Sequence, residues 1–148
     1  MMTELVTTKI KYRPISGVET QVAGENLLRY WIEGKKISLR KIESVYREEA
    51  NDPRASGISH MVINGNLHRT PDGSLEGPMW GSYVTNNEEL GGYWTGRFHG
   101  YFYNNGTFQF DAYGNGGGAF KGQRIRLHST SGDSAQSIFE GYIQETCT

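Results

Sequence analysis

The chain has 148 residues and a formal net charge of -1, from 15 Lys and Arg against 16 Asp and Glu. This length suits one domain, residues 1–148, and is short for two. A charge this close to zero supplies no basic field for nucleic acid or for an anionic membrane surface. We therefore expect neither kind of partner.

The two ends of the chain bear on compartment and redox chemistry. Residues 1–14 are polar within a few positions and lack the continuous apolar segment of a secretory signal. No stretch approaches the ~20 apolar residues of a membrane-spanning helix. Cys147 is the only cysteine, which excludes an intrachain disulfide and a cysteine-based zinc site. These features predict a cytoplasmic protein without a metal or other cofactor.

Alternating polar and apolar residues, separated by turn-forming residues, predict at least eight strands. In chain order the predicted strands are residues 5–12, 25–32, 36–46, 57–68, 78–85, 91–102, 107–113, 123–129 and 137–144. Residues 40–50 are rich in helix formers, so the third strand is expected to finish in a short helical end. The glycines at 116–118 predict a turn.

Short connections between successive strands predict antiparallel neighbours, and a sheet of this size commonly removes its edges by closing. Of the 20 glycines, 15 lie at or beyond Gly73, many inside strand patterns, where they allow a coiled sheet to bend. We therefore predict an all-β fold, a single antiparallel up-and-down β-barrel of about eight strands.

The inner face of this barrel is predicted to be the apolar one, because burying each large side chain contributes roughly 1.5 to 3 kcal/mol. It comprises Met61, Ile63, Leu67, Trp94, Phe98, Phe102, Phe108, Phe110, Ile125, Leu127, Phe139 and Ile143. The opposite face carries His60, Asn64, Asn66, His68, Arg97, His99, Tyr101, Arg124, Arg126 and His128. On a convex outer surface these polar groups diverge, so they are not expected to form one catalytic site.

Candidate ligand-contacting residues are the large apolar side chains that could line an interior or mouth. They are Met61, Trp80, Trp94, Phe98, Phe102, Phe108 and Phe110. No catalytic residue can be assigned. Glu43 alternates with Leu39, Lys41 and Val45, so one polar side chain of this strand is a candidate for the interior, where burial would raise a carboxyl pKa.

Two features of the sequence suggest a dinucleotide-binding loop and a metal site, and neither fits on closer inspection. Residues 114–119, GNGGGA, precede a strand-like segment rather than a helix, so they do not fit a dinucleotide-binding loop and are expected at the barrel rim. His60 and His68 stand roughly 26 Å apart along one predicted strand, too far to share a metal ion. No metal site is expected.

The segment 51–57, the pair Trp80-Gly81, the motif 92–96 (GYWTG) and the glycine-rich 114–122 resemble bacterial β-barrel proteins of unassigned function. The wider resemblance, over roughly residues 45–143, is to the allene oxide cyclase-like barrels, a calycin-type group. That group includes cyclases and isomerases that fold an apolar substrate inside the barrel. The resemblance points to an activity of this kind, but no catalytic residue of those enzymes maps onto this chain, so the activity itself is not carried over.

Three functions are consistent with these patterns. The first is a barrel that binds a small hydrophobic molecule in its interior or mouth. The second is a cofactor-independent cyclase or isomerase in which Tyr, His or Glu handles a proton. The third is a solidly packed scaffold that acts through homo-oligomerisation, since eight strands enclose a space that side chains alone can fill.

Overall fold

The computed structural model describes residues 9–23, 30–131 and 136–147. These residues form nine strands and one short 3-10 helix, η2 (Pro53–Ala55). The strands are β1 (Lys9–Ala23), β2 (Tyr30–Glu33), β3 (Lys36–Ala50), β4 (Gly57–Arg69), β5 (Leu75–Asn87), β6 (Gly92–Phe102), β7 (Phe108–Gly118), β8 (Arg124–Ser131) and β9 (Gln136–Cys147).

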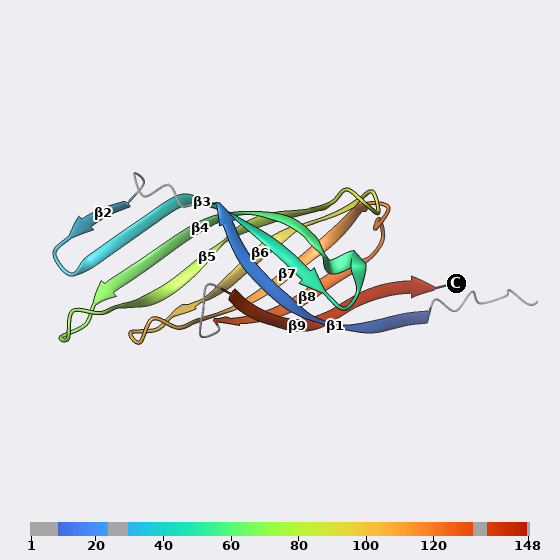
Figure 1. Cartoon of the computed structure of the whole chain (residues 1–148). Coiled ribbons are helices and arrows are strands. Elements are labelled where there is room, and N and C mark those ends of the chain that lie inside the picture. The colour runs from blue at the N-terminus through green and yellow to red at the C-terminus, as the bar shows by residue number, and fades with distance from the viewer. Residues whose placement is uncertain (1–8, 24–29, 132–135, 148) are drawn as a thin grey trace, which may run out of the picture.

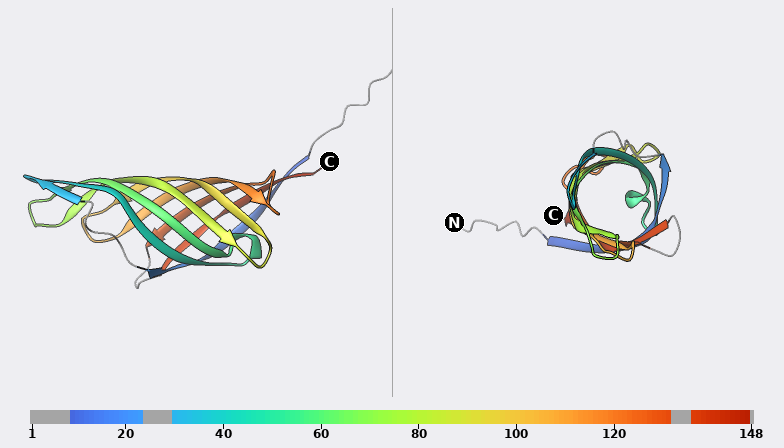
Figure 2. Two further views of the ribbon diagram at one scale, coloured as in Figure 1. Left: turned by 90° about the horizontal axis from the view of Figure 1, so that it is seen from above. Right: turned by 90° about the vertical axis from the view of Figure 1, so that its left-hand side faces the viewer.

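The strands form one antiparallel sheet that closes on itself (Figure 1). Strands β3 to β9 pair in chain order, and β1 pairs with both β9 and β3, which completes a ring of eight. The right-hand view of Figure 2 looks into this ring and shows η2 inside its outline. The all-β, antiparallel, up-and-down barrel predicted from the sequence is confirmed. Strand β2 lies outside the ring, paired with the first residues of β3.

The sequence pattern placed the first strand too early in the chain and made it too short. The prediction covered residues 5–12, of which 5–8 lie outside the described residues, whereas β1 continues to Ala23 through Pro14 and Gly17. Both residues ordinarily interrupt strands. At Gly17 an added Cβ would lie 2.4 Å from the Phe139 ring, so glycine is required for close packing where the barrel closes. Of the predicted strand 25–32, residues 25–29 also fall outside the described residues.

Strand β3 corrects two expectations. No helical end is present, because β3 stays extended to Ala50 and pairs there with both β1 and β4. A bulge interrupts its pairing with β4 between Leu39 and Ile42, with Lys41 at a φ of 51°. Since one extra residue reverses the alternation of side chains, every position beyond the bulge faces the opposite way from a simple count.

The predicted turn at residues 116–118 is instead the end of strand β7, which pairs with β6 as far as Gly118. At this point the glycines leave room for the Phe120 backbone and for the aromatic ring of Tyr93. A Cβ on Gly116 would lie 2.1 Å from the Phe120 carbonyl oxygen, and one on Gly117 would lie 2.1 Å from the Tyr93 ring. The expected rim connection begins only beyond the strand.

The apolar face points inward, as predicted. Trp94, Phe98 and Ile143 are at most 2% exposed, and the largest core cluster joins side chains from strands all around the ring. Opposite Phe98, on the next position of the same strand, His99 is exposed. Among the described residues, no helix is long and apolar enough to cross a membrane.

Candidate functional site

A cavity of about 50 Å³ lies in the interior of the barrel, lined by described residues. Its walls are mostly apolar and come from strands on all sides of the ring. The lining residues are Glu19, Glu48, Ala55, Ser59, Met61, Tyr83, Thr85, Trp94, Phe98, Phe110, Ala112, Ile125, Leu127, Ser129 and Phe139. The presence of two glutamates in this set makes the cavity the candidate functional site.

The seven predicted ligand-contacting residues are divided by the structure. Met61, Trp94, Phe98 and Phe110 line the cavity. Phe108 is partly buried and stacks on Phe110, with ring centroids 4.8 Å apart. Phe102 is half-buried near the end of β6, outside the cavity lining. Trp80 lies on the outer surface, 37% exposed, with the Arg40 guanidinium 5.3 Å from its ring.

The short helix η2 closes one end of the cavity. Asp52 caps it by accepting a hydrogen bond of 3.0 Å from the Arg54 backbone N–H, and buried Ala55 faces the interior. The indole Nε1 of Trp94 donates to the Arg54 carbonyl oxygen at 2.8 Å. A buried tryptophan requires a partner for this N–H, so the contact joins Trp94 in the cavity wall to η2, which we call the plug.

Ion pairs hold the plug from outside the cavity. The Arg54 Nη2 lies 2.7 Å from Asp52 Oδ2 and 3.5 Å from Glu145 Oε1, and Arg13 also binds Glu145 at 2.7 Å. Hydrogen bonding to Arg54 lowers the pKa of Asp52, and hydrogen bonding to Arg13 lowers that of Glu145. The Arg54 charge is therefore balanced by carboxylates at the barrel end.

Two carboxyl groups meet inside the barrel without such a balance. Glu19 of β1 and Glu48 of β3 are directly opposite each other in the antiparallel register. Glu48 is only 7% exposed. Burial, followed by the charge and hydrogen bonding of Glu19, raises the pKa of Glu48 well above its usual range. Two neighbouring carboxyl groups in an apolar site thus favour a shared proton over two charges.

Three buried polar atoms that border the cavity have no hydrogen-bond partner within the described part of the chain: Glu48 Oε2, the Tyr83 hydroxyl and Ser129 Oγ. Burial raises the pKa of Tyr83, and the nearby Glu48 adds to the effect. An unsatisfied buried polar group costs about 1–3 kcal/mol, so native proteins seldom keep three together without a use for them.

The space around these groups is created by small residues. A Cβ on Gly114 would lie 2.5 Å from the Tyr83 hydroxyl oxygen, so only glycine leaves room for that hydroxyl. Other polar side chains of the lining have partners: the Thr85 hydroxyl donates to Ser59 Oγ at 3.1 Å, and Glu19 Oε1 accepts a hydrogen bond from the Ser137 hydroxyl at 3.4 Å. Among the described lining residues, the buried side-chain oxygens without a partner are those of Glu48, Tyr83 and Ser129.

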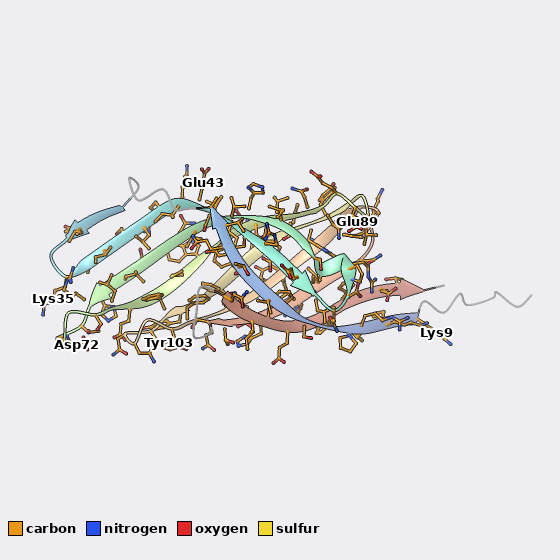
Figure 3. The ribbon with its side chains drawn as sticks, in the orientation of Figure 1. Lys9, Lys35, Glu43, Asp72, Glu89 and Tyr103 are labelled. Atoms are coloured by element: carbon orange, nitrogen blue, oxygen red, sulfur yellow. The ribbon has the colours of Figure 1, made fainter. Side chains whose placement is uncertain are left out.

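The interior carboxyl group is not the one that the sequence indicated. Glu43 is exposed, and Figure 3 shows it pointing away from the barrel. The reason is the bulge before Ile42, which reverses the alternation, so that Ile42, Ser44 and Glu48 face inward. Counting in twos from Ile42 would have reached Glu48, but the position of the bulge is not visible in the sequence.

The polar outer face forms cross-strand rows instead of a converging site. His99, Asp111, His128 and Glu140 occupy successive register positions on β6 to β9, and His128 Nδ1 lies 2.9 Å from Asp111 Oδ1. In the resolved ranges, no group of three or more His, Cys, Asp or Glu side chains is arranged to hold a metal ion. Comparison with protein-family models, curated proteins and solved structures finds no match to this chain.

Proposed function

We propose that this protein binds a small, mainly apolar molecule that carries a polar group, and that it does so inside the barrel. The observation that supports this proposal is a cavity whose lining combines apolar and aromatic side chains with three residues that have unpartnered buried oxygens. Binding sites for small molecules commonly combine such walls with a few polar groups that fix orientation.

The size of the cavity limits the ligand. A volume of about 50 Å³ accommodates a few water molecules or a group of a few non-hydrogen atoms. Typical sites for larger ligands are roughly 300–1,000 Å³, so a longer ligand would need side chains to move. Met61 is the lining residue best suited to move, because its unbranched side chain adapts easily.

A purely structural role explains these residues less well. A scaffold barrel gains most from an interior filled with apolar side chains. Here the interior keeps two glutamates and two unpartnered hydroxyls, at a cost of about 1–3 kcal/mol for each unsatisfied group. Function is the usual reason for such a cost.

The proposal is tested by native mass spectrometry of freshly purified protein, before and after denaturing extraction. We expect a reproducible small-molecule adduct that disappears on extraction. Filling the cavity with Phe98→Trp or with the milder Ala112→Val should abolish the adduct, whereas the outward Val84→Ile should retain it. An adduct that persists in both filled variants, with folding intact, would place the ligand elsewhere, and no adduct at all would argue against the proposal.

A second candidate function is cofactor-independent isomerisation. It is favoured by the Glu19–Glu48 pair, in which a protonated Glu48 can donate to a substrate oxygen while a neighbouring carboxylate accepts a proton from carbon. The resemblance to the allene oxide cyclase-like barrels supports this candidate by analogy alone.

Acetone provides a small test substrate for this second function. Enolisation in deuterated water exchanges its methyl protons, which NMR follows directly. If the pair acts as acid and base, the wild-type protein should accelerate exchange over buffer, and Glu48→Gln should remove the acceleration while Glu43→Gln keeps it. Equal exchange with and without the wild-type protein would contradict proton transfer to small carbonyl compounds.

A further inference from the structure

We propose that the Glu19–Glu48 pair in the cavity lining binds the ammonium group of a small primary amine. This inference rests on the proposed binding function and names the chemical class of its ligand. It is supported by the arrangement of Glu19 and Glu48, by the unpartnered hydroxyls of two other lining residues, Tyr83 and Ser129, and by the aromatic walls.

The first observation is an uncompensated acidic pair. Glu19 and Glu48 occupy directly opposed positions on adjacent strands, an arrangement in which like charges destabilise the sheet. No lysine, arginine or histidine is found among the described residues that line the cavity. Arg54, which is next to the lining residue Ala55, is bound to Asp52 and Glu145 at the barrel end. A cation supplied by a ligand would therefore complete this site.

The second observation is the match between donors and acceptors. A primary ammonium group has three N–H donors and no acceptor. Three residues of the cavity lining have a buried oxygen without a hydrogen-bond partner among the described residues, Glu48 Oε2, the Tyr83 hydroxyl and Ser129 Oγ, and each oxygen can accept a hydrogen bond. Tyr83 and Ser129 are 7% and 9% exposed, so water from the surface does not readily serve them.

The third observation concerns the rest of the ligand. Trp94, Phe98 and Phe110 line the same cavity and offer aromatic and apolar surface. Aromatic faces attract cations, by about 0.5–2 kcal/mol depending on desolvation, and they also bury the carbon chain of an alkylamine. The cavity of about 50 Å³ suits an amine of a few non-hydrogen atoms.

A shared proton is the alternative occupant of the acidic pair. The titratable groups that face Glu48 are Glu19 from β1 and Tyr83 from β5. When an ammonium group binds, the proton held by the carboxyl pair is expelled, so the affinity should rise with pH by up to tenfold per unit above the usual glutamate range. A neutral ligand that accepts a hydrogen bond from protonated Glu48 would show the opposite pH dependence.

The test is isothermal titration of the full chain at pH 8 with n-propylammonium chloride, 1-propanol and sodium propionate. These probes share a carbon chain and differ in the charge of the polar group. We expect n-propylammonium to bind at least tenfold more tightly than 1-propanol, with no detectable propionate binding, and its affinity to fall when the titration is repeated at pH 6.

Variants connect the selectivity to the site. Glu48→Gln should weaken n-propylammonium binding at least tenfold and leave 1-propanol binding within about threefold, whereas the exposed Glu43→Gln should change neither. Tyr83→Phe, which removes one acceptor and keeps the ring, is a second variant should Glu48→Gln fail to fold, and it should weaken n-propylammonium several-fold.

The outcomes separate this inference from the function on which it rests. If 1-propanol binds as tightly as n-propylammonium, and both are displaced by Ala112→Val, the cavity binds ligands but the ammonium assignment is wrong. If n-propylammonium binds and Glu43→Gln weakens it as much as Glu48→Gln, the ammonium site is not in the barrel. If no probe binds, the ammonium inference fails, while an adduct in native mass spectrometry would still support binding of another ligand.

Discussion

Glu48 shows how one buried side chain can dominate the chemistry of a small barrel. It lies opposite Glu19, is almost fully buried, and borders a cavity that Tyr83 also lines. Its pKa is raised because burial and a like charge both disfavour the carboxylate.

The raised pKa of Glu48 predicts an unusual pH dependence of stability. A group that binds its proton more tightly when folded stabilises the fold fully below its unfolded pKa, near 4.5, and loses that contribution as the pH rises toward the folded pKa. Within that window the wild-type protein should lose about 1.4 kcal/mol per pH unit from this group. Glu48→Gln replaces the titrating carboxyl group with an amide, so this pH-dependent contribution to stability is lost.

The measurement is thermal unfolding of wild type, Glu48→Gln and the control Glu43→Gln from pH 5 to pH 8. The Tm of Glu48→Gln minus that of wild type should increase with pH, and more steeply than the same difference for the exposed control Glu43→Gln. A constant difference for Glu48→Gln would show that Glu48 has no raised pKa in the folded protein. Asp52 and Glu145, whose pKa values are lowered, lose their contributions only below this window.

At the scale of elements, the barrel depends on close contacts between neighbouring strands. Gly141 of β9 and Gly65 of β4 occupy inward-facing positions of their strands, but a side chain added at each would have different surroundings. A Cβ on Gly141 would lie 1.8 Å from the Arg126 carbonyl oxygen, a backbone atom that cannot move freely. A Cβ on Gly65 would lie 3.3 Å from Met79 Cγ, which belongs to a flexible side chain.

Gly141→Ala is therefore expected to destabilise the barrel by about 1–3 kcal/mol, the usual cost of forcing atoms into a packed interior. Gly65→Ala is the matched control and should change stability by less than about 1 kcal/mol, because Met79 can adapt. Urea unfolding at a fixed pH compares the two. Equal destabilisation by both substitutions would mean that the close approach to the Arg126 carbonyl oxygen does not set the cost.

The plug η2 is the other element whose formation can be tested. Asp52 accepts an N-cap hydrogen bond from the Arg54 backbone N–H at 3.0 Å. It also forms an ion pair with the Arg54 side chain at 2.7 Å. The cap contributes about 0.5–2 kcal/mol and a partly exposed ion pair up to about 1 kcal/mol. Asp52→Ala should lose both.

Asp52→Asn preserves the capping oxygen and removes the charge, so it should recover most of the stability lost in Asp52→Ala. The two variants are compared by urea unfolding, and Trp94 fluorescence reports the plug because its indole donates to Arg54. If Asp52→Asn is as unstable as Asp52→Ala, the ion pair and not the cap holds the plug.

For the whole molecule, closure of the ring depends on β1. This strand follows β9 from Lys9 to Thr20 and also pairs with the last residues of β3, so Gly17 to Thr20 have partners on both sides. Strand β2 pairs on one side only, with Lys36 to Leu39. Hydrogen bonds on both sides should protect the amides of Gly17 to Thr20 from exchange far longer than those of β2.

Hydrogen exchange followed by mass spectrometry measures this difference. Peptides that cover Gly17 to Thr20 should exchange at rates similar to those of β6 and β7, and peptides that cover Tyr30 to Glu33 should exchange first. Exchange of β1 as fast as that of β2 would mean that the sheet opens between β1 and β3 in solution.

Much of this architecture follows from local pattern. Alternation at strand spacing in residues 91–102 correctly predicts that Trp94 and Phe98 face inward and that Arg97 and His99 face outward. The turns at Gly34-Lys35 and at residues 104–106 follow from residues that favour reversal. These predictions hold because side chains alternate strictly along an uninterrupted strand and large apolar groups are stabilised by burial.

The sequence by itself determined the fold class, the single closed sheet and the apolar interior, since each depends on local periodicity and on the hydrophobic effect. Only the tertiary structure decided which carboxyl groups enter the cavity. A bulge at Lys41 reversed the alternation in β3, and β1 returned across Pro14 and Gly17 to bring Glu19 opposite Glu48. Such pairing joins segments far apart in the chain, so no local pattern contains it.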